Sequence, residues 1–148
     1  MTKVLFIGQA PGPDNHAGEP LHPSTRSGRR LVELLGVDNE AYLEQFDRVN
    51  LLQKFPGKWA RDDRFPMKEA KIAAAAIRPF LKHRMVIMLG RVVAEAFGVP
   101  PCPQVMWIAR PGFHGVAVLP HPSGRNRWYS DPNNMRAARR FMRKVASL

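Results

Sequence analysis

Four short segments stand apart along the chain as candidate strands, and one of them, Phe46 to Leu52, has polar residues among its apolar ones. Each contains valine or isoleucine and is bounded by glycine, proline or polar turn formers. The runs are Lys3 to Ile7, Phe46 to Leu52, Met85 to Leu89 and Val116 to Leu119, with Val105 to Ala109 as a candidate extra strand. Segments with helical spacing lie between them. Strands that alternate with helices predict a parallel sheet with helices on both faces.

Cap and turn residues mark where the helices begin and end. Ser24 or Ser27 is the expected N-cap of a helix that ends before Gly36. Asp131 is the expected N-cap of the last helix, with Pro132 at its first position. The other predicted helices are residues 67–82, kinked or ended near Pro79, and residues 91–97, between Gly90 and Gly98.

The composition of the chain indicates what kind of partner it binds. The 148 residues fit one domain and hold 23 lysines and arginines against 12 acidic residues, a net charge of +11. Such an excess in a small protein predicts a polyanionic partner, nucleic acid foremost. The single cysteine, Cys102, excludes an internal disulfide and any site built on several thiolates. Because the first apolar run is too short for a signal peptide and none reaches membrane-spanning length, we expect a cytoplasmic protein without membrane contact.

The last apolar run carries a histidine to the edge of the predicted sheet. His121 comes directly after Pro120 and is followed by Pro122 and Ser123. In open α/β sheets, ligands bind beyond the carboxyl ends of the strands. The pattern therefore predicts an imidazole in a binding site. A second His-Pro-Ser, beginning at His22, follows no strand, and we interpret it as a loop and helix cap.

The first and second strands also end in candidate binding residues. The turn from Gly8 to Gly12 has glycines at both ends, which lets backbone amides converge on a ligand. Asn50 is either a turn former or an amide that reads a pyrimidine edge. Lys58 lies in the basic loop that follows, beside Trp59, which suits either base stacking or packing onto the core.

Three motifs together resemble the uracil-DNA glycosylase superfamily, in the order of that family. They are FIGQAPGP after the first strand, RVNLLQKFPGK after the second and LPHPSGRN after the last. The resemblance implies one domain over residues 1–148, a three-layer α/β/α sandwich with a central four-stranded parallel sheet. It also implies a monomer that flips a base out of DNA and hydrolyses its glycosidic bond, without a metal or other cofactor.

The resemblance also implies a role for each part of the site. His121 would stabilise the departing base, and Gln9 would orient water, with Asp14 as the alternative group. Base binding would fall to Gly8, Ala10, Gly12, Leu21 and Asn50. DNA contacts would come from Ser123, Gly124, Arg125, Asn126, Arg127, Trp128 and Lys58, with Arg125 as the wedge that fills the place of the flipped base.

The motifs depart from the family's pattern at the water site and at the stacking position. Ala10 stands where the superfamily has a water-positioning Asp or Asn, and Gln9 stands where the branch with the closest first motif has Glu. Leu21 or His22 occupies the region of the expected stacking aromatic residue, which leaves room for a base other than uracil. The iron-sulfur cysteines of that branch are absent from this sequence.

Two function classes therefore remain in competition. The leading hypothesis is a monofunctional DNA glycosylase that acts on uracil or a modified pyrimidine in single- or double-stranded DNA. The alternative is a catalytically weak or inactive DNA-binding protein that keeps the glycosylase fold, as Gln9 and Ala10 favour. An enzyme for free nucleotides fits less well, because a small substrate needs no broad basic surface.

Overall fold

The computed structural model describes residues 2–11, 19–53, 66–100, 102–123 and 126–148, and its centre is one parallel sheet. Four strands pair in the order β2-β1-β3-β4. Their bounds are Val4–Gly8 for β1, Phe46–Asn50 for β2, Met85–Leu89 for β3 and Gly115–Leu119 for β4. The predicted α/β class with a four-stranded parallel sheet is therefore confirmed.

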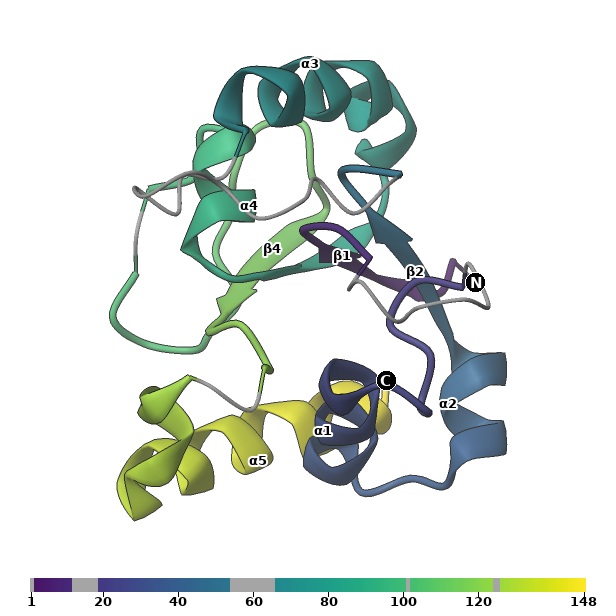
Figure 1. Ribbon diagram of the computed structural model, residues 1–148, viewed down its shortest axis with the longest axis vertical. Helices are drawn as coiled ribbons and strands as arrows, with labels where there is room; N and C mark the ends of the chain where they lie inside the picture. The colour runs from purple at the N-terminus through teal and green to yellow at the C-terminus, as the bar shows by residue number, and fades with distance from the viewer. Residues whose placement is uncertain (1, 12–18, 54–65, 101, 124–125) are drawn as a thin grey trace.

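Helices cover both faces of this sheet and make three layers (Figure 1). One layer holds α1 (Arg26–Leu35), α2 (Asn39–Gln45) and α5 (Pro132–Ala146), and the other holds α3 (Met67–Ile77) and α4 (Arg91–Ala96). Two short 3-10 helices, η1 (Arg78–Leu81) and η2 (Arg127–Ser130), complete the described elements. The crossover helices are what allow all four strands to run in the same direction.

The central strands are apolar throughout because they are buried on both faces. Successive side chains of a strand point to opposite faces, so β1 divides between two cores. Phe6 packs in the cluster under α1 and α5, whereas Leu5 and Ile7 pack in the cluster under α3 and α4. Strand β3 divides in the same way. This double burial fixes the register and holds the carboxyl ends of the strands together at one edge.

The start of α1 differs from the prediction. Thr25, and not Ser24 or Ser27, is the N-cap, and its hydroxyl accepts a hydrogen bond from the Gly28 amide at 3.1 Å. The Ser24 hydroxyl instead lies 2.8 Å from the imidazole Nδ1 of His22. The error is one of register, since three hydroxyl residues within four positions, Ser24, Thr25 and Ser27, all offer acceptable caps by sequence.

Two further elements differ from the prediction. Helix α2 was not predicted, because it is seven residues long and buries one side chain, Tyr42, so its apolar period is too weak to detect. The expected strand over Val105 to Ala109 is wrong, since Ile108 makes a single antiparallel bridge to Val116 there. The predicted end of α3 near Pro79 and the Asp131 cap of α5 are confirmed.

Gly28 lets α1 approach the loop that carries Leu21. A Cβ atom on Gly28 would lie 2.1 Å from the His22 carbonyl oxygen and 2.4 Å from that of Leu21. We expect Gly28→Ala to lower the free energy of unfolding by about 1–3 kcal/mol, because overpacking outweighs the better helix propensity of alanine. Chemical denaturation measures this, with Ser27→Ala on the same helix as the control. A Gly28→Ala protein as stable as that control would contradict the close packing.

Candidate active site

The four strands deliver their last residues to one edge of the sheet. The backbone pairing continues beyond β1 and β2, since the Leu51 amide donates to the Gly8 oxygen at 3.0 Å and the Leu52 amide to the Gln9 oxygen at 2.9 Å. Beyond β3 and β4, the Gly90 amide donates to the Leu119 oxygen at 2.8 Å. The turns after all four strands are thus held side by side, at the edge where α/β sheets bind ligands.

Three of the predicted base-binding residues meet at the ends of β1 and β2. Gly8 pairs with Asn50 in the sheet register. A Cβ atom on Gly8 would lie 2.5 Å from the Asn50 Oδ1 atom and 3.4 Å from a Leu21 methyl carbon. The missing side chain of Gly8 therefore makes the room in which the Asn50 amide lies against the backbone. Asn50 is half-buried, which leaves its amide open to a ligand edge.

Leu21 is held in an uncommon conformation beside that amide. Its φ of 53° is positive, a region that non-glycine residues rarely adopt. The Tyr42 hydroxyl donates to the Leu21 carbonyl at 2.8 Å, and burial raises the pKa of Tyr42, so the hydroxyl keeps its proton. Leu21 is itself 8% exposed. The backbone here is therefore fixed from both sides, by Tyr42 and by the close approach of Gly28, and it presents an aliphatic wall.

His22 does not share this position. Its Nδ1 accepts a hydrogen bond from the Ser24 amide at 3.1 Å, and its Nε2 lies 3.8 Å from a Glu19 carboxylate oxygen at the exposed side of the loop. Of the two residues considered for the stacking position, Leu21 is the one that lies against Gly8.

The turn after β4 fixes the tautomer of His121. The Ser123 amide donates to Nδ1 of His121 at 3.2 Å. Because Nδ1 accepts this bond, the proton of the neutral imidazole resides on Nε2. Burial lowers the pKa of His121 below its ordinary value of 6.5. At neutral pH the site therefore holds an uncharged imidazole with an N–H donor on Nε2.

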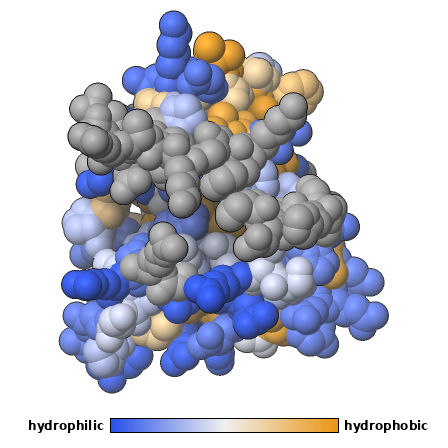
Figure 2. All heavy atoms as spheres, viewed as in Figure 1, coloured by the Kyte–Doolittle hydropathy of each residue, from blue (hydrophilic) through white to orange (hydrophobic). Residues whose placement is uncertain are grey.

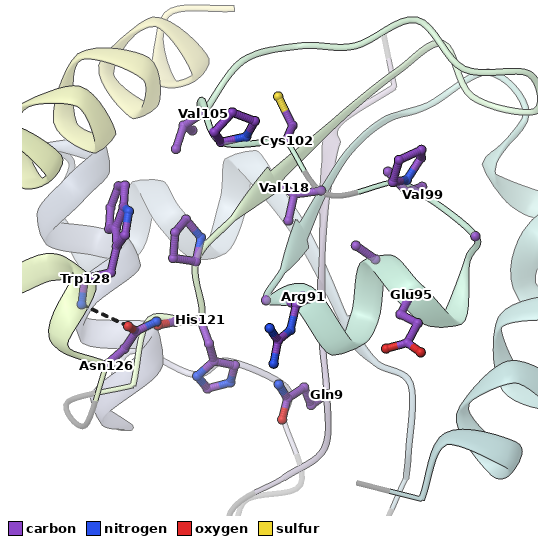
Figure 3. Close-up of a pocket in the computed structure, with 16 residues that line it drawn as sticks. Gln9, Arg91, Glu95, Val99, Cys102, Val105, Val118, His121, Asn126 and Trp128 are labelled. Carbon is purple, nitrogen blue, oxygen red and sulfur yellow. Dashed lines mark hydrogen bonds between the residues drawn. The ribbon is translucent and has the colours of Figure 1, made fainter. Parts of the chain in front are cut away.

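Three further hydrogen bonds brace this turn. The Asn126 side-chain amide donates to the His121 carbonyl at 3.0 Å, and its oxygen accepts from the Trp128 amide at 3.0 Å (Figure 3). The Tyr129 hydroxyl donates to the Pro120 carbonyl at 2.5 Å. His121 is thus carried on a turn whose backbone is bonded on both sides, which is the rigidity that a preorganised donor requires.

Gln9 and His121 lie side by side across a glycine that the sequence analysis did not assign to the site (Figure 3). A Cβ atom on Gly90 would lie 3.3 Å from the Gln9 Nε2 atom and 3.3 Å from His121 Cβ. Gly90 also has a φ of 101°, which a larger residue would adopt with strain. The signal for Gly90 was present, since it directly follows a buried strand as Gly8 does.

A cavity of about 840 Å³ opens next to Gln9 and His121. Its walls come from α4, from the segment that follows that helix, from the end of β4 and from η2 (Figure 3). Asn126 and Trp128, both predicted to contact DNA, line it as well.

The remaining predicted residues divide into two groups. Ala10 is half-buried and directly follows Gln9. Arg127 is exposed at the start of η2. Gly12, Asp14, Lys58, Gly124 and Arg125 lie outside the described residues. The described part of the chain holds no group of three His, Cys, Asp or Glu side chains placed to bind a metal ion. None of its helices has the length and apolar character needed to cross a membrane.

Comparison with protein families identifies one match. A family model described as the uracil DNA glycosylase superfamily matches residues 1–145. That range contains every strand of the sheet and both the Gly8–Gln9 and the His121 turns. No curated protein matches the chain.

Proposed function

Since the chain belongs to the uracil DNA glycosylase superfamily, whose members are generally DNA glycosylases, we propose that it hydrolyses the N-glycosidic bond of a pyrimidine in DNA. The products would be a free base and an abasic strand. Uracil is the base expected first, with a modified pyrimidine as the competitor. The reaction would need the base outside the helix stack, because an enzyme cannot reach the target atom of a base that is paired inside a duplex.

The observation that carries this proposal is the hydrogen bond from the Ser123 amide to Nδ1 of His121, which assigns the proton of the neutral imidazole to Nε2. As the glycosidic bond breaks, negative charge develops on the base and the sugar becomes an oxocarbenium-like cation. A fixed donor at the base carbonyl stabilises that charge as it forms. The Ser123 amide on Nδ1 and the lowered pKa of His121 together support a donor that does not have to lose or gain a proton first.

Gln9 would orient the attacking water molecule. Its amide lies beside His121 and can orient a water molecule, but it cannot accept the proton. An oxocarbenium-like sugar is electrophilic enough to react with a weakly activated water, so orientation can suffice at a modest rate. Asp14 is the alternative group in this proposal, since its carboxylate could accept a proton from water.

Base selection would fall to Asn50 and Leu21. The Asn50 amide can donate to a carbonyl and accept from an imide N–H, which is the pattern of the uracil edge. Leu21 contributes aliphatic contact in place of ring stacking. Because aliphatic contact holds a base less tightly than ring stacking does, the site would admit substituted pyrimidines as well as uracil.

A DNA-binding protein without catalysis is the second candidate. Ala10 and Gln9 favour it, since neither offers a carboxylate to activate water. The half-buried imidazole of His121 argues for the enzyme, because binding to the DNA backbone alone does not require a donor of fixed tautomer.

Detection of abasic sites separates the two candidates. Strands with uracil or one of several modified pyrimidines, single or paired, are incubated with the protein and then cleaved by alkali at abasic positions. We expect cleavage at one class of base, and binding that weakens steeply with salt because phosphate contacts release counterions. Salt-sensitive binding with no abasic site in any strand would favour the DNA-binding protein.

The pH dependence of base release follows from the lowered pKa of His121. The neutral imidazole is the active form, so the rate should be flat above pH 6.5 and fall only as the pH drops through the lowered pKa, below 6.5. Stability should change over the same pH range. As the pH decreases, His121 is protonated in the unfolded chain before it is protonated in the folded protein, so the free energy of unfolding decreases once the pH drops under 6.5. This decrease stops when the pH is lower than the pKa of His121 in the folded protein.

Rate and denaturation profiles against pH check this, with His121→Gln as the control that lacks the group. The difference in stability between the wild type and His121→Gln isolates His121 from the other histidines. An activity loss that begins above pH 6.5 would mean a raised pKa and would contradict the neutral donor.

A further inference from the structure

The cavity beside His121 does not include the place where Gly8 meets Asn50 and Leu21. It shares Gln9 and His121 with the candidate site, whereas Gly8, Leu21 and Asn50 are not among the described residues that line it. It extends from His121 over the end of β4 toward Trp128 and the segment after α4 (Figure 3). A base held against Asn50 therefore leaves this volume unfilled.

The lining suits a flat apolar ring with polar groups at its edge. Val99, Val105 and Val118 form aliphatic walls, and Trp128 supplies an aromatic face. Arg91 and Glu95, both exposed on α4, lie at the border of the same cavity. About 840 Å³ is within the range of small-molecule sites and is ample for a nucleoside.

Trp128 is tied to His121 through a single side chain. Asn126 accepts from the Trp128 amide and donates to the His121 carbonyl, and Trp128 packs edge-on against Tyr129 at 4.9 Å between centroids. The aromatic wall and the imidazole are therefore parts of one braced turn. A ligand that stacks on the Trp128 ring would therefore lie next to a second group bound at His121.

We propose that this cavity receives the base adjacent to the flipped nucleotide in an unpaired strand, stacked on Trp128. The inference rests on the proposed function, since it takes the flipped base to lie at His121. The next nucleotide of the same strand is covalently tied to that position, the chain carries a net charge of +11 that attracts the strand, and Arg91 can pair with a phosphate. In a duplex the adjacent base stays paired, so the cavity favours single strands.

The test uses binding and needs no turnover. The probe is a single-stranded oligonucleotide with a 2′-fluorinated deoxyuridine that resists cleavage and with 2-aminopurine on its 5′ or 3′ side. A matched strand has an abasic analogue in place of 2-aminopurine. We expect quenched 2-aminopurine fluorescence for one of the two sides, and about tenfold tighter binding of that strand than of its abasic match.

Two variants and a control locate the effect. Trp128→Leu should abolish both the quenching and the affinity difference, and Val105→Phe should reduce both by filling part of the cavity. Trp107→Leu is the matched control, because Trp107 packs on Phe141 at 5.3 Å and is not among the residues that line the cavity. It should keep the quenching and the difference. Circular dichroism of each variant confirms the fold.

Three results would overturn the inference. Equal affinity for the two strands, with binding retained, would refute the adjacent-base site and leave the glycosylase proposal intact. A gain that appears only with a bulky group on the target base itself would assign the cavity to that substituent. Failure to bind any strand would refute both the cavity site and the proposed action on DNA.

Discussion

Replacing His121 with alanine is expected to slow base release by about a hundredfold or more, while affinity for DNA stays close to that of the wild type. The loss corresponds to one fixed donor at the charge that develops on the departing base, about 3 kcal/mol in comparable sites. Binding should persist because the imidazole is neutral and contributes no charge to phosphate attraction. Single-turnover rates and equilibrium binding to the same strand measure the two quantities separately.

His22 provides a matched control for that experiment. It lies in a second His-Pro-Ser turn of the same local geometry, in which the amide two residues on donates to Nδ1 at 3.1 Å, compared with 3.2 Å at His121. The His22 side chain is partly exposed and lies 3.8 Å from a Glu19 carboxylate oxygen. We expect His22→Ala to retain base release. Equal losses in the two variants, or a parallel loss of binding in His121→Ala, would contradict the assigned role.

Gly8→Ala is expected to lower base release by about ten- to a hundredfold, with little loss of stability. The new methyl group would meet the Asn50 Oδ1 atom at 2.5 Å, and the side chain of Asn50 can move away where backbone could not. The cost is then the loss of one or two hydrogen bonds to the base, about 1–3 kcal/mol. Rates on the preferred substrate, together with chemical denaturation, measure the effect.

The same change in an Asn50→Ala background tests the mechanism. If Gly8→Ala acts by displacing Asn50, it should have little further effect once that amide is gone, so the two substitutions should be strongly non-additive. Additive losses would show that Gly8→Ala disturbs the turn itself and would contradict the role of Asn50 in base binding.

The sheet and the reactive edge were predictable because both depend on local pattern. The strands at Val4–Gly8 and Met85–Leu89 are apolar on both faces, and such runs stand out in any window. His121 follows a strand directly, so the parallel sheet alone carries it to the binding edge. The joint role of Gly8 and Asn50 was expected only from the family resemblance, and the pairing of β1 with β2 brings the two residues together.

The parts that were not predicted depend on contacts distant in sequence. The role of Gly90 depends on the position of β3 between β1 and β4 in the sheet. This order places the space left by its missing side chain between Gln9 and His121. The cavity lies between α4, the following segment and η2, none of which signals a site alone. The cap at Thr25 was not predicted because the Ser24 hydroxyl contacts the His22 imidazole in place of the helix. Helix-capping preferences of single residues do not include such a contact.

The basic surface of the molecule is consistent with a nucleic-acid partner. Figure 2 shows hydrophilic residues over most of the visible face, with apolar groups gathered near α3 at the top. The described arginines of α5, such as Arg136 and Arg140, are exposed. This charge can attract a DNA strand, and in the proposed reaction the turns at the sheet edge would select the bond that is cut.

The central claim is that His121 enables this protein to release a base from DNA. Mass spectrometry of the free base tests it most directly, with a single-stranded oligonucleotide that carries uracil or a panel of modified pyrimidines. We predict that the wild type releases one kind of pyrimidine and leaves an abasic strand, and that His121→Ala releases almost none. The absence of a free base from every strand, with salt-sensitive binding intact, would contradict the account and favour a DNA-binding protein on a glycosylase fold.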